Sequence, residues 1–184
     1  MVIQAMDLVM TDILGNCCAI VIKHPSFPTG TVLVEALYQV ETVAPAELQV
    51  HRYLPAALVR CLMDADGHNI ASQHEYQSFC GQELSIDPND LFRIIESQAA
   101  GLKTMISQAA ESANAVLKQV IDVAMREMAQ DLETELHRLT ELRKVNANVR
   151  TEEIDFLQST RQRMTQAIHK AALRHDAIRV IIVA

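Results

Sequence analysis

A long helical repeat dominates the second half of the chain and limits the folds open to it. After Gly101, apolar residues recur at alternating four- and three-residue steps, which predicts one amphipathic helix over about 102–145. At 1.5 Å per residue, such a helix is roughly 65 Å long, more than the width of a small domain. Its apolar stripe needs a partner. The stripe begins with Leu102, Ile106, Ala109, Ala113, Val116, Val120 and Val123, and continues with Met128, Leu132, Leu136, Leu139 and Leu142.

The partner follows at once in the sequence. A short link over 145–149 leads to a second amphipathic segment, in which Thr151 is the expected N-cap. Glu152, Glu153 and Asp155 suit the positive end of that helix. A short link between two amphipathic helices predicts an antiparallel helical hairpin. The second stripe consists of Ile154, Leu157, Met164, Ile168 and Ala171.

The first half of the chain is rich in β-strand signals. Compact or alternating apolar runs predict strands over 17–22, 31–43, 48–53, 56–63 and 69–79. Another β-branched run closes the chain at 178–183. The predicted fold class is α+β: an antiparallel sheet, with strands in 17–79 plus a C-terminal strand at 177–183, and the long antiparallel hairpin.

The predicted organisation is one domain with four parts. Residues 1–16 contain a short helix over 2–14, residues 17–86 are β-rich, residues 87–175 are helical, and residues 176–184 complete the sheet. Asp87-Pro88 starts the helical part with an N-cap acceptor and a first-turn proline. The apolar helix at residue 2 has nothing before it to shield its stripe, which suggests a fragment of a longer protein.

The sequence contains no pattern that predicts a catalytic, cofactor or metal site. The five glycines form no phosphate-binding loop, dinucleotide fingerprint or nucleophile elbow. The seven histidines lack metal-ligand spacing, and Asp64-Ala65-Asp66-Gly67 fits a hairpin turn better than a calcium loop. The cysteines form no CxxC motif and are expected to be reduced thiols: Cys17, Cys18, Cys61 and Cys80.

Charge is unevenly spread along the chain. Residues 1–135 hold 7 basic and 18 acidic groups, whereas residues 136–184 hold 9 basic and 5 acidic groups. This modest C-terminal excess gives weak support for nucleic-acid contact and fits a solvated helical face better. With no signal peptide and no membrane-spanning run, the chain is expected to be cytoplasmic.

Four segments together resemble the C-terminal region of the RapA family, the bacterial RNA polymerase-associated ATPases of the Swi/Snf helicase-like class. They are 33–41 with Ala44-Pro45, 48–49 with 52–55, 139–150 and 176–183. The resemblance covers roughly residues 30–184, and the last two segments are its most specific part. One departure is Ala147, where the family leads us to expect proline.

The resemblance implies a role in transcription through RNA polymerase, with ATP and magnesium bound far upstream of this region. It implies a non-catalytic interaction or positioning module here, with no cofactor of its own and no membrane contact. The resemblance assigns no site to a residue of this region. The expected partner contacts are instead cations that cluster in the sequence of the hairpin, and the alternative is that these cations only solvate the helices: Arg138, Arg143, Lys144, Arg150, Arg161 and Arg163. The alternative is a free-standing adaptor whose hairpin dimerises or binds a partner helix.

Overall fold

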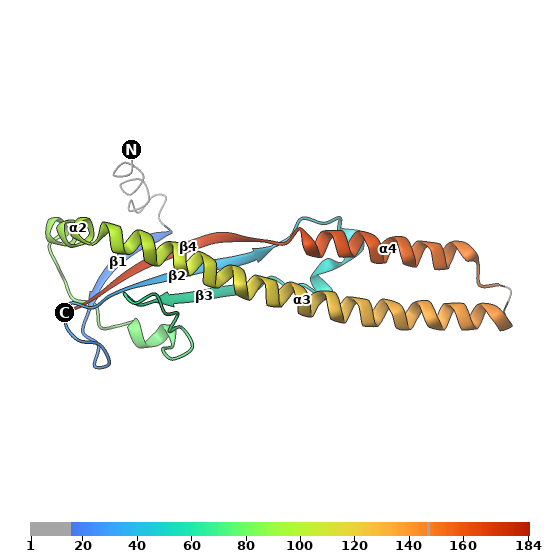
Figure 1. The fold of residues 1–184 in the computed structure, drawn as a ribbon, viewed down its shortest axis with the longest axis horizontal. Helices are drawn as coiled ribbons and strands as arrows, with labels where there is room; N and C mark the ends of the chain where they lie inside the picture. The colour runs from blue at the N-terminus through green and yellow to red at the C-terminus, as the bar shows by residue number, and fades with distance from the viewer. Residues whose placement is uncertain (1–15, 147) are drawn as a thin grey trace. The chain divides into compact units, whose positions relative to one another are not determined.

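The computed structural model describes residues 16–146 and 148–184 (Figure 1). The helix predicted over 2–14 lies outside the described residues. The described chain divides into two compact units, and the prediction that they form one domain stays a prediction. The sheet unit comprises residues 16–39, Leu58–Asn114 and Arg174–Ala184, and the hairpin unit comprises Val40–Ala57 and Ala115–Leu173.

The strands form one four-stranded sheet in the order β1-β4-β2-β3. Their bounds are Cys17–Ile22 for β1, Val32–Glu41 for β2, Leu58–Met63 for β3 and Ala172–Val183 for β4. β2 and β3 are antiparallel, but β1 and β4 are parallel, with Cys17 opposite Ile178. The sheet is therefore mixed, and the prediction of a purely antiparallel sheet was wrong.

The C-terminal strand is the reason for the mixed sheet. Ile181, Ile182 and Val183 are consecutive and all buried, so both faces of β4 are covered there. A strand covered on both faces is stable in the middle of a sheet, and β4 accordingly lies between β1 and β2. Residues 23–171 supply the long connection that parallel strands require.

Two of the predicted strands are wrong. Residues 48–53 fall in two 3-10 turns, η1 (Ala46–Leu48) and η2 (Val50–Arg52), joined by Gln49 in the left-handed conformation (φ 47°). Residues 69–79 pair with the sheet only at Asn69 and then form η3 (Tyr76–Phe79). The Asn69 side chain accepts the backbone N–H groups of Leu62 and Ala71, which replaces regular ladder pairing.

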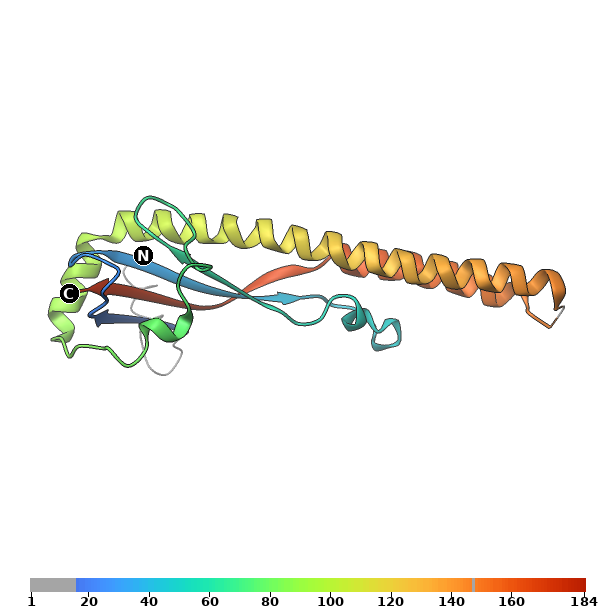
Figure 2. The same ribbon diagram turned by 90° about the horizontal axis from the view of Figure 1, so that it is seen from below.

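The sheet unit is covered on both faces, as Figure 2 shows. One face packs against the segment that contains η3, through a cluster of Ile22, Leu33, Leu62, Ile70, Phe79, Ile181 and Val183. The other face carries Val34, Ala36 and Cys61 and meets the first turns of α3 (Ala99–Val145), whose buried residues here are Leu102, Met105, Ala109 and Ala113. Strand alternation produces the two faces.

The helices predicted from residue 87 onward are confirmed, with small changes at their ends. α2 (Pro88–Ser97) begins as expected, because Asp87 Oδ1 accepts the N–H of Asn89 at 2.8 Å. α3 spans 47 residues and runs through Gly101. α4 (Thr151–His169) has Arg150, not Thr151, at its N-cap, without a side-chain hydrogen bond. None of the described helices combines the length and apolar character that crossing a bilayer requires.

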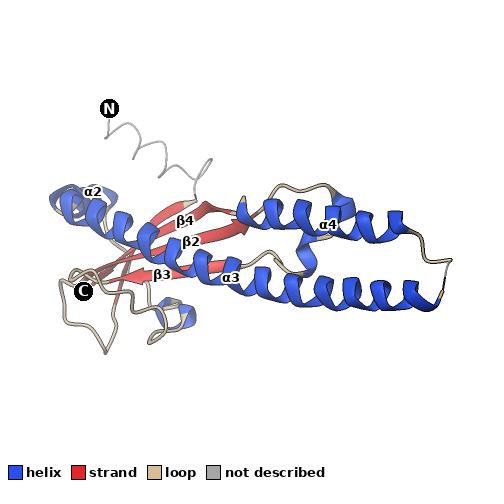
Figure 3. Ribbon diagram, turned by 45° about the vertical axis from the view of Figure 1, so that its right-hand side comes forward, coloured by secondary structure: helices blue, strands red, loops and turns tan. Residues whose placement is uncertain are grey.

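Within the hairpin unit, α4 lies beside the C-terminal part of α3 (Figure 3). An ion pair between Arg161 on α4 and Glu133 on α3 (2.7 Å) joins the two helices. Burial falls along the hairpin. Its root is packed with Leu48, Val50, Ala124, Met128, Met164, Ala167 and Ile168, whereas the stripe residues Leu132, Leu136, Leu139, Ile154 and Leu157 are only partly buried.

This gradient predicts unequal effects of truncation along the stripe. Met128→Ala should lower the free energy of unfolding by about 2–5 kcal/mol, because a fully buried side chain leaves a cavity. Leu139→Ala should lower it by only about 1 kcal/mol, because its side chain already contacts water. Urea unfolding followed by circular dichroism measures both. Equal losses for the two variants would contradict the gradient.

Candidate interaction surface

The six cations predicted to contact a partner all belong to the hairpin unit. Arg138, Arg143 and Lys144 lie on α3, Arg150 precedes α4, and Arg161 and Arg163 lie on α4. Four of them already hold a carboxylate. The pairs are Arg138–Glu135 (2.6 Å), Lys144–Glu141 (2.6 Å), Arg161–Glu133 (2.7 Å) and Arg163–Glu47 (2.7 Å).

These pairs are exposed, so they contribute little to stability. The hydrogen bond from Arg138 lowers the pKa of the Glu135 carboxyl, and the one from Lys144 lowers the pKa of Glu141. Arg143 and Arg150 make no ion pair with any residue that the structure describes. Four of the six cations that were predicted to contact a partner are thus already neutralised by carboxylates within the hairpin unit.

A network of buried charges crosses one face of the sheet unit. The Glu35 side chain on β2 is 2% exposed and lies between two guanidinium groups. Arg60 Nε donates to Glu35 Oε1 at 2.6 Å, and Arg179 Nε donates to Oε2 at 2.7 Å. Both arginine side chains are largely buried, so the network carries a net positive charge out of water.

The same arginines hold the segment over 71–80 against the sheet. Arg60 Nη1 donates to the carbonyl oxygens of Ala71 (3.2 Å) and His74 (2.7 Å). The guanidinium of Arg179 lies 4.5 Å from the centre of the Tyr76 ring. Burial disfavours the charged form of Arg179, but Glu35 above all favours it, and the pKa of Arg179 is raised. Arg179 therefore stays charged as a structural anchor.

A cavity of about 260 Å³ opens beside this network. Residues around it include Cys17, Cys18, Glu35, Leu37, Tyr76 and Arg179. Burial raises the pKa of both thiols, which lowers the thiolate fraction at neutral pH. Arg179 is already bound to Glu35. The arrangement favours a structural role over nucleophilic or anion-binding chemistry.

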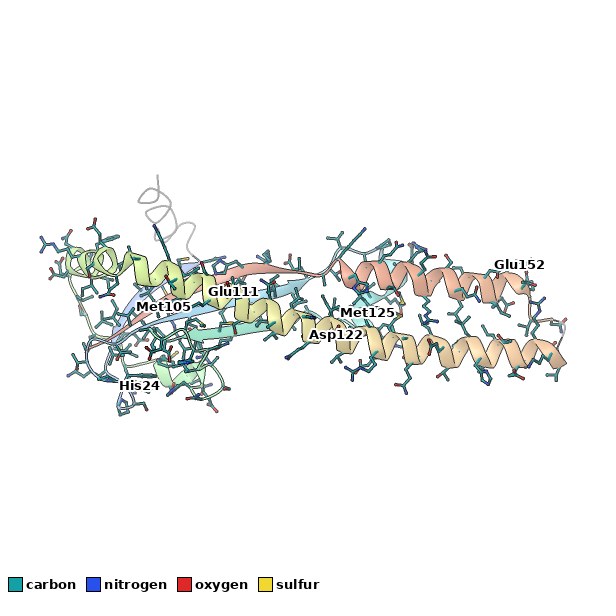
Figure 4. The ribbon with its side chains drawn as sticks, in the orientation of Figure 1. His24, Met105, Glu111, Asp122, Met125 and Glu152 are labelled. Atoms are coloured by element: carbon teal, nitrogen blue, oxygen red, sulfur yellow. The ribbon has the colours of Figure 1, made fainter. Side chains whose placement is uncertain are left out.

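Two histidines that are distant in sequence meet among aromatic rings. His24, labelled in Figure 4, stacks on Phe79 with ring centres 5.0 Å apart and lies 5.9 Å from His74. Burial, and then the neighbouring His74, lowers the pKa of His24. A neutral imidazole packs well against aromatic rings, so this cluster completes the apolar core.

Three side chains of the types that bind metal ions lie close together. A carboxylate oxygen of Asp64, one of Asp66 and an imidazole nitrogen of His68 are within 4.8 Å of one another. Asp64 Oδ1 also accepts the backbone N–H groups of Asp66 (3.0 Å) and His68 (2.8 Å), and Gly67 has a positive φ of 86°. These are the bonds of a tight turn. They confirm the turn predicted at Asp64–Gly67. The turn itself also explains why these three side chains lie close together.

Comparison with known proteins identifies the family. Residues 1–183 match the family described as the C-terminal region of the RNA polymerase recycling family, RapA. The chain belongs to this RapA C-terminal family. The RNA polymerase-associated protein RapA of Yersinia pestis (strain Pestoides F) is 36% identical over 180 residues, or 98% of this chain. RapA of Yersinia pseudotuberculosis serotype O:1b (strain IP 31758) gives the same values.

The chain spans 19% of the length of these RapA proteins. The predicted resemblance to the C-terminal region of RapA is therefore confirmed, and the family match extends over the N-terminal residues as well. The names of these relatives place RapA proteins with bacterial RNA polymerase.

The Glu35 network was not predicted from the sequence. Glu35 lies on the same face of β2 as Leu33 and Leu37. A single carboxylate between two apolar residues of one strand face was the available signal. Its partners Arg60 and Arg179 could not be found from spacing, because they lie on two other strands.

Proposed function

We propose that this RapA C-terminal region is a non-catalytic interaction or positioning module of an ATP-dependent factor that recycles RNA polymerase. The observation that carries the proposal is the family match over residues 1–183, together with relatives named for their association with RNA polymerase. On this proposal, ATP and magnesium bind elsewhere in a longer cytoplasmic protein of the Swi/Snf helicase-like class.

The geometry supports a contact role for the hairpin unit. Its root is packed, while α3 and α4 beyond the root expose most of their side chains. That exposed part adds little to the core and offers a surface for a partner. In the sheet unit, by contrast, Glu35 is paired with Arg60 and Arg179. His24 is stacked on Phe79, so these polar side chains already have structural partners.

Charge reversal at three neighbouring cations of the hairpin unit tests this proposal; Lys144 is paired with Glu141, whereas Arg143 and Arg150 make no ion pair among the described residues. In the longer RapA chain, changing Arg143, Lys144 and Arg150 to Glu should weaken binding to bacterial RNA polymerase about 3–10-fold at low salt, with a smaller difference at high salt. Surface plasmon resonance at two salt concentrations measures the change.

A matched control makes the same change of charge in the sheet unit, at Lys23, Arg93 and Lys103. These exposed side chains lie outside the proposed surface, so their reversal should leave binding within about twofold. Equal weakening by both triple variants would indicate a general charge effect. A further variant of the longer RapA chain lacks the whole region that is numbered 1–184 here. If this deletion caused no loss of polymerase binding, it would contradict the proposed function itself.

A further inference from the structure

Two histidines and two phenylalanines of the sheet unit form a cluster of four rings, which we call the ring cluster. His24 and Phe27 come from the loop that follows β1, and His74 and Phe79 come from the segment over 71–80. The centre of the His24 ring, labelled in Figure 4, lies 5.1 Å from that of Phe27 and 5.0 Å from that of Phe79. The centres of His74 and Phe27 are 4.8 Å apart. Ring contacts therefore join the loop to the segment.

The hydrogen bond of the His24 ring requires a neutral imidazole. Its Nδ1 accepts the backbone N–H of Ser26 at 3.3 Å, and an imidazole nitrogen accepts a hydrogen bond only while it carries no proton. In the protonated ring both nitrogens are donors, so Nδ1–H would face the N–H of Ser26. Protonation of His24 therefore breaks the bond that orients its ring within the loop.

The positive groups around the ring cluster also oppose a charge on His24. Lys23 precedes it in the loop, and the His74 ring faces it in a T-shaped arrangement at 5.9 Å. Arg60 Nη1 donates to the carbonyl oxygen of His74 at 2.7 Å. A fixed cation thus already lies against the segment that the His24 ring contacts.

The neighbouring carboxylates do not supply a counter-charge to His24. They are Asp64, Asp66 and Glu75. The first two line a cavity together with Phe27 and His74, and Glu75 follows His74 in the sequence. Among the residues that the structure describes, none of the three forms an ion pair with His24, and the Asp64 carboxylate lies 3.4 Å from His68 Nδ1 instead.

The direction of the pH dependence follows from these surroundings. Burial, and then the neighbouring His74, lowers the pKa of His24. The folded chain therefore binds fewer protons at this residue than the unfolded chain does in mild acid. Above the unfolded pKa of about 6.5, His24 is neutral in both states and the contact is fully stabilising. As the pH falls from there toward the lower folded pKa, the contribution of the contact is lost.

We propose that the ring cluster is a pH-sensitive contact, in which protonation of His24 loosens the segment over 71–80 from the loop that follows β1. The segment then opens more often in mild acid than at neutral pH. Each opening exposes the apolar face of the sheet that Ile70 and Phe79 cover. The inference concerns the sheet unit alone and does not depend on the proposed function.

Hydrogen exchange of the full chain tests this contact at pH 7.5 and at pH 5.5, which lies about one unit below the ordinary histidine pKa. Rates are corrected for the intrinsic effect of pH on exchange. The reporting amides are hydrogen-bonded within the segment and belong to Gln73, Ser78 and Cys80. We expect their protection factors to be about fivefold lower at pH 5.5, whereas those over 102–113 in α3 change less than about twofold.

Substitutions of histidine identify the group that titrates. His24→Phe keeps a ring in the cluster but cannot be protonated, so protection over 71–80 should stay within about twofold between the two pH values. His175→Phe is the matched control and should retain the whole fall. His175 is an exposed histidine of the same unit, and its ring stacks on that of Tyr38 with centres 5.0 Å apart.

A second variant guards against a failure of His24→Phe to fold. In His24→Asn, the side-chain oxygen can still accept the N–H of Ser26, and no group titrates at this position. It should likewise abolish the fall in protection. A fall that persists in a folded His24 variant would overturn the proposal, and so would unchanged protection of the parent chain. An equal fall over 102–113 would also overturn it, because acid would then destabilise the whole unit rather than this contact.

Discussion

Removal of residues 177–184 is expected to unfold the sheet unit. The deletion takes away most of β4, the strand that lies between β1 and β2. It removes the buried side chains of Ile181, Ile182 and Val183, each of which contributes about 1.5–3 kcal/mol. Their sum of about 5–9 kcal/mol approaches the whole stability of a typical domain, about 5–15 kcal/mol.

Loss of backbone pairing adds to this effect. Without β4, β1 has no neighbour in the sheet, and the hydrogen bonds from Ile178 N–H to Asn16 and from Ala184 N–H to Ile22 disappear. Calorimetry should show no cooperative unfolding of the sheet unit in the truncated chain. Deletion of exposed Ala184 alone is the control and should preserve the transition. A truncated chain that melts within a few degrees of the parent would contradict the central position of β4.

Replacement of Glu35 by Gln is expected to destabilise the sheet unit by about 3–5 kcal/mol, because two buried guanidinium groups would lose their counter-charge. Chemical unfolding measures the loss. Glu111→Gln is the matched control. Glu111, labelled in Figure 4, is an exposed glutamate on α3 in the same unit, and its replacement should change stability by no more than about 0.5 kcal/mol.

A second substitution distinguishes the ion network from ordinary packing. If Glu35 acts by neutralising two cations, Glu35→Gln should cost less in an Arg179→Met background, where one of those cations has been removed. The expected coupling is about 1–3 kcal/mol. Additive effects of the two substitutions would show that Glu35 and Arg179 contribute independently. Replacing Glu35, Arg60 and Arg179 together by apolar residues should be far less harmful than Glu35→Gln alone.

The sequence by itself determined the local elements whose signals lie close together along the chain. The repeat over 102–145 predicted α3, because a helix places residues three and four apart on one face. Asp87-Pro88 predicted the start of α2, since its cap bond spans only two residues. The short link at 145–149 predicted that α4 returns along α3. The four quoted segments were sufficient to indicate the RapA family.

Only the tertiary structure decided how those elements combine. β4 lies parallel to β1, and no local pattern specifies which strand a C-terminal segment will join. The apolar residues at 48–53 suggested a strand, but they fill the hairpin root from two 3-10 turns, because burial there is set by neighbouring helices. Glu35, Arg60 and Arg179 meet across three strands. The spacing of residues in a sequence reveals the periodicity of a single helix or strand. Strand order and ion-pair partners depend instead on which surfaces, distant in the sequence, pack together and exclude water.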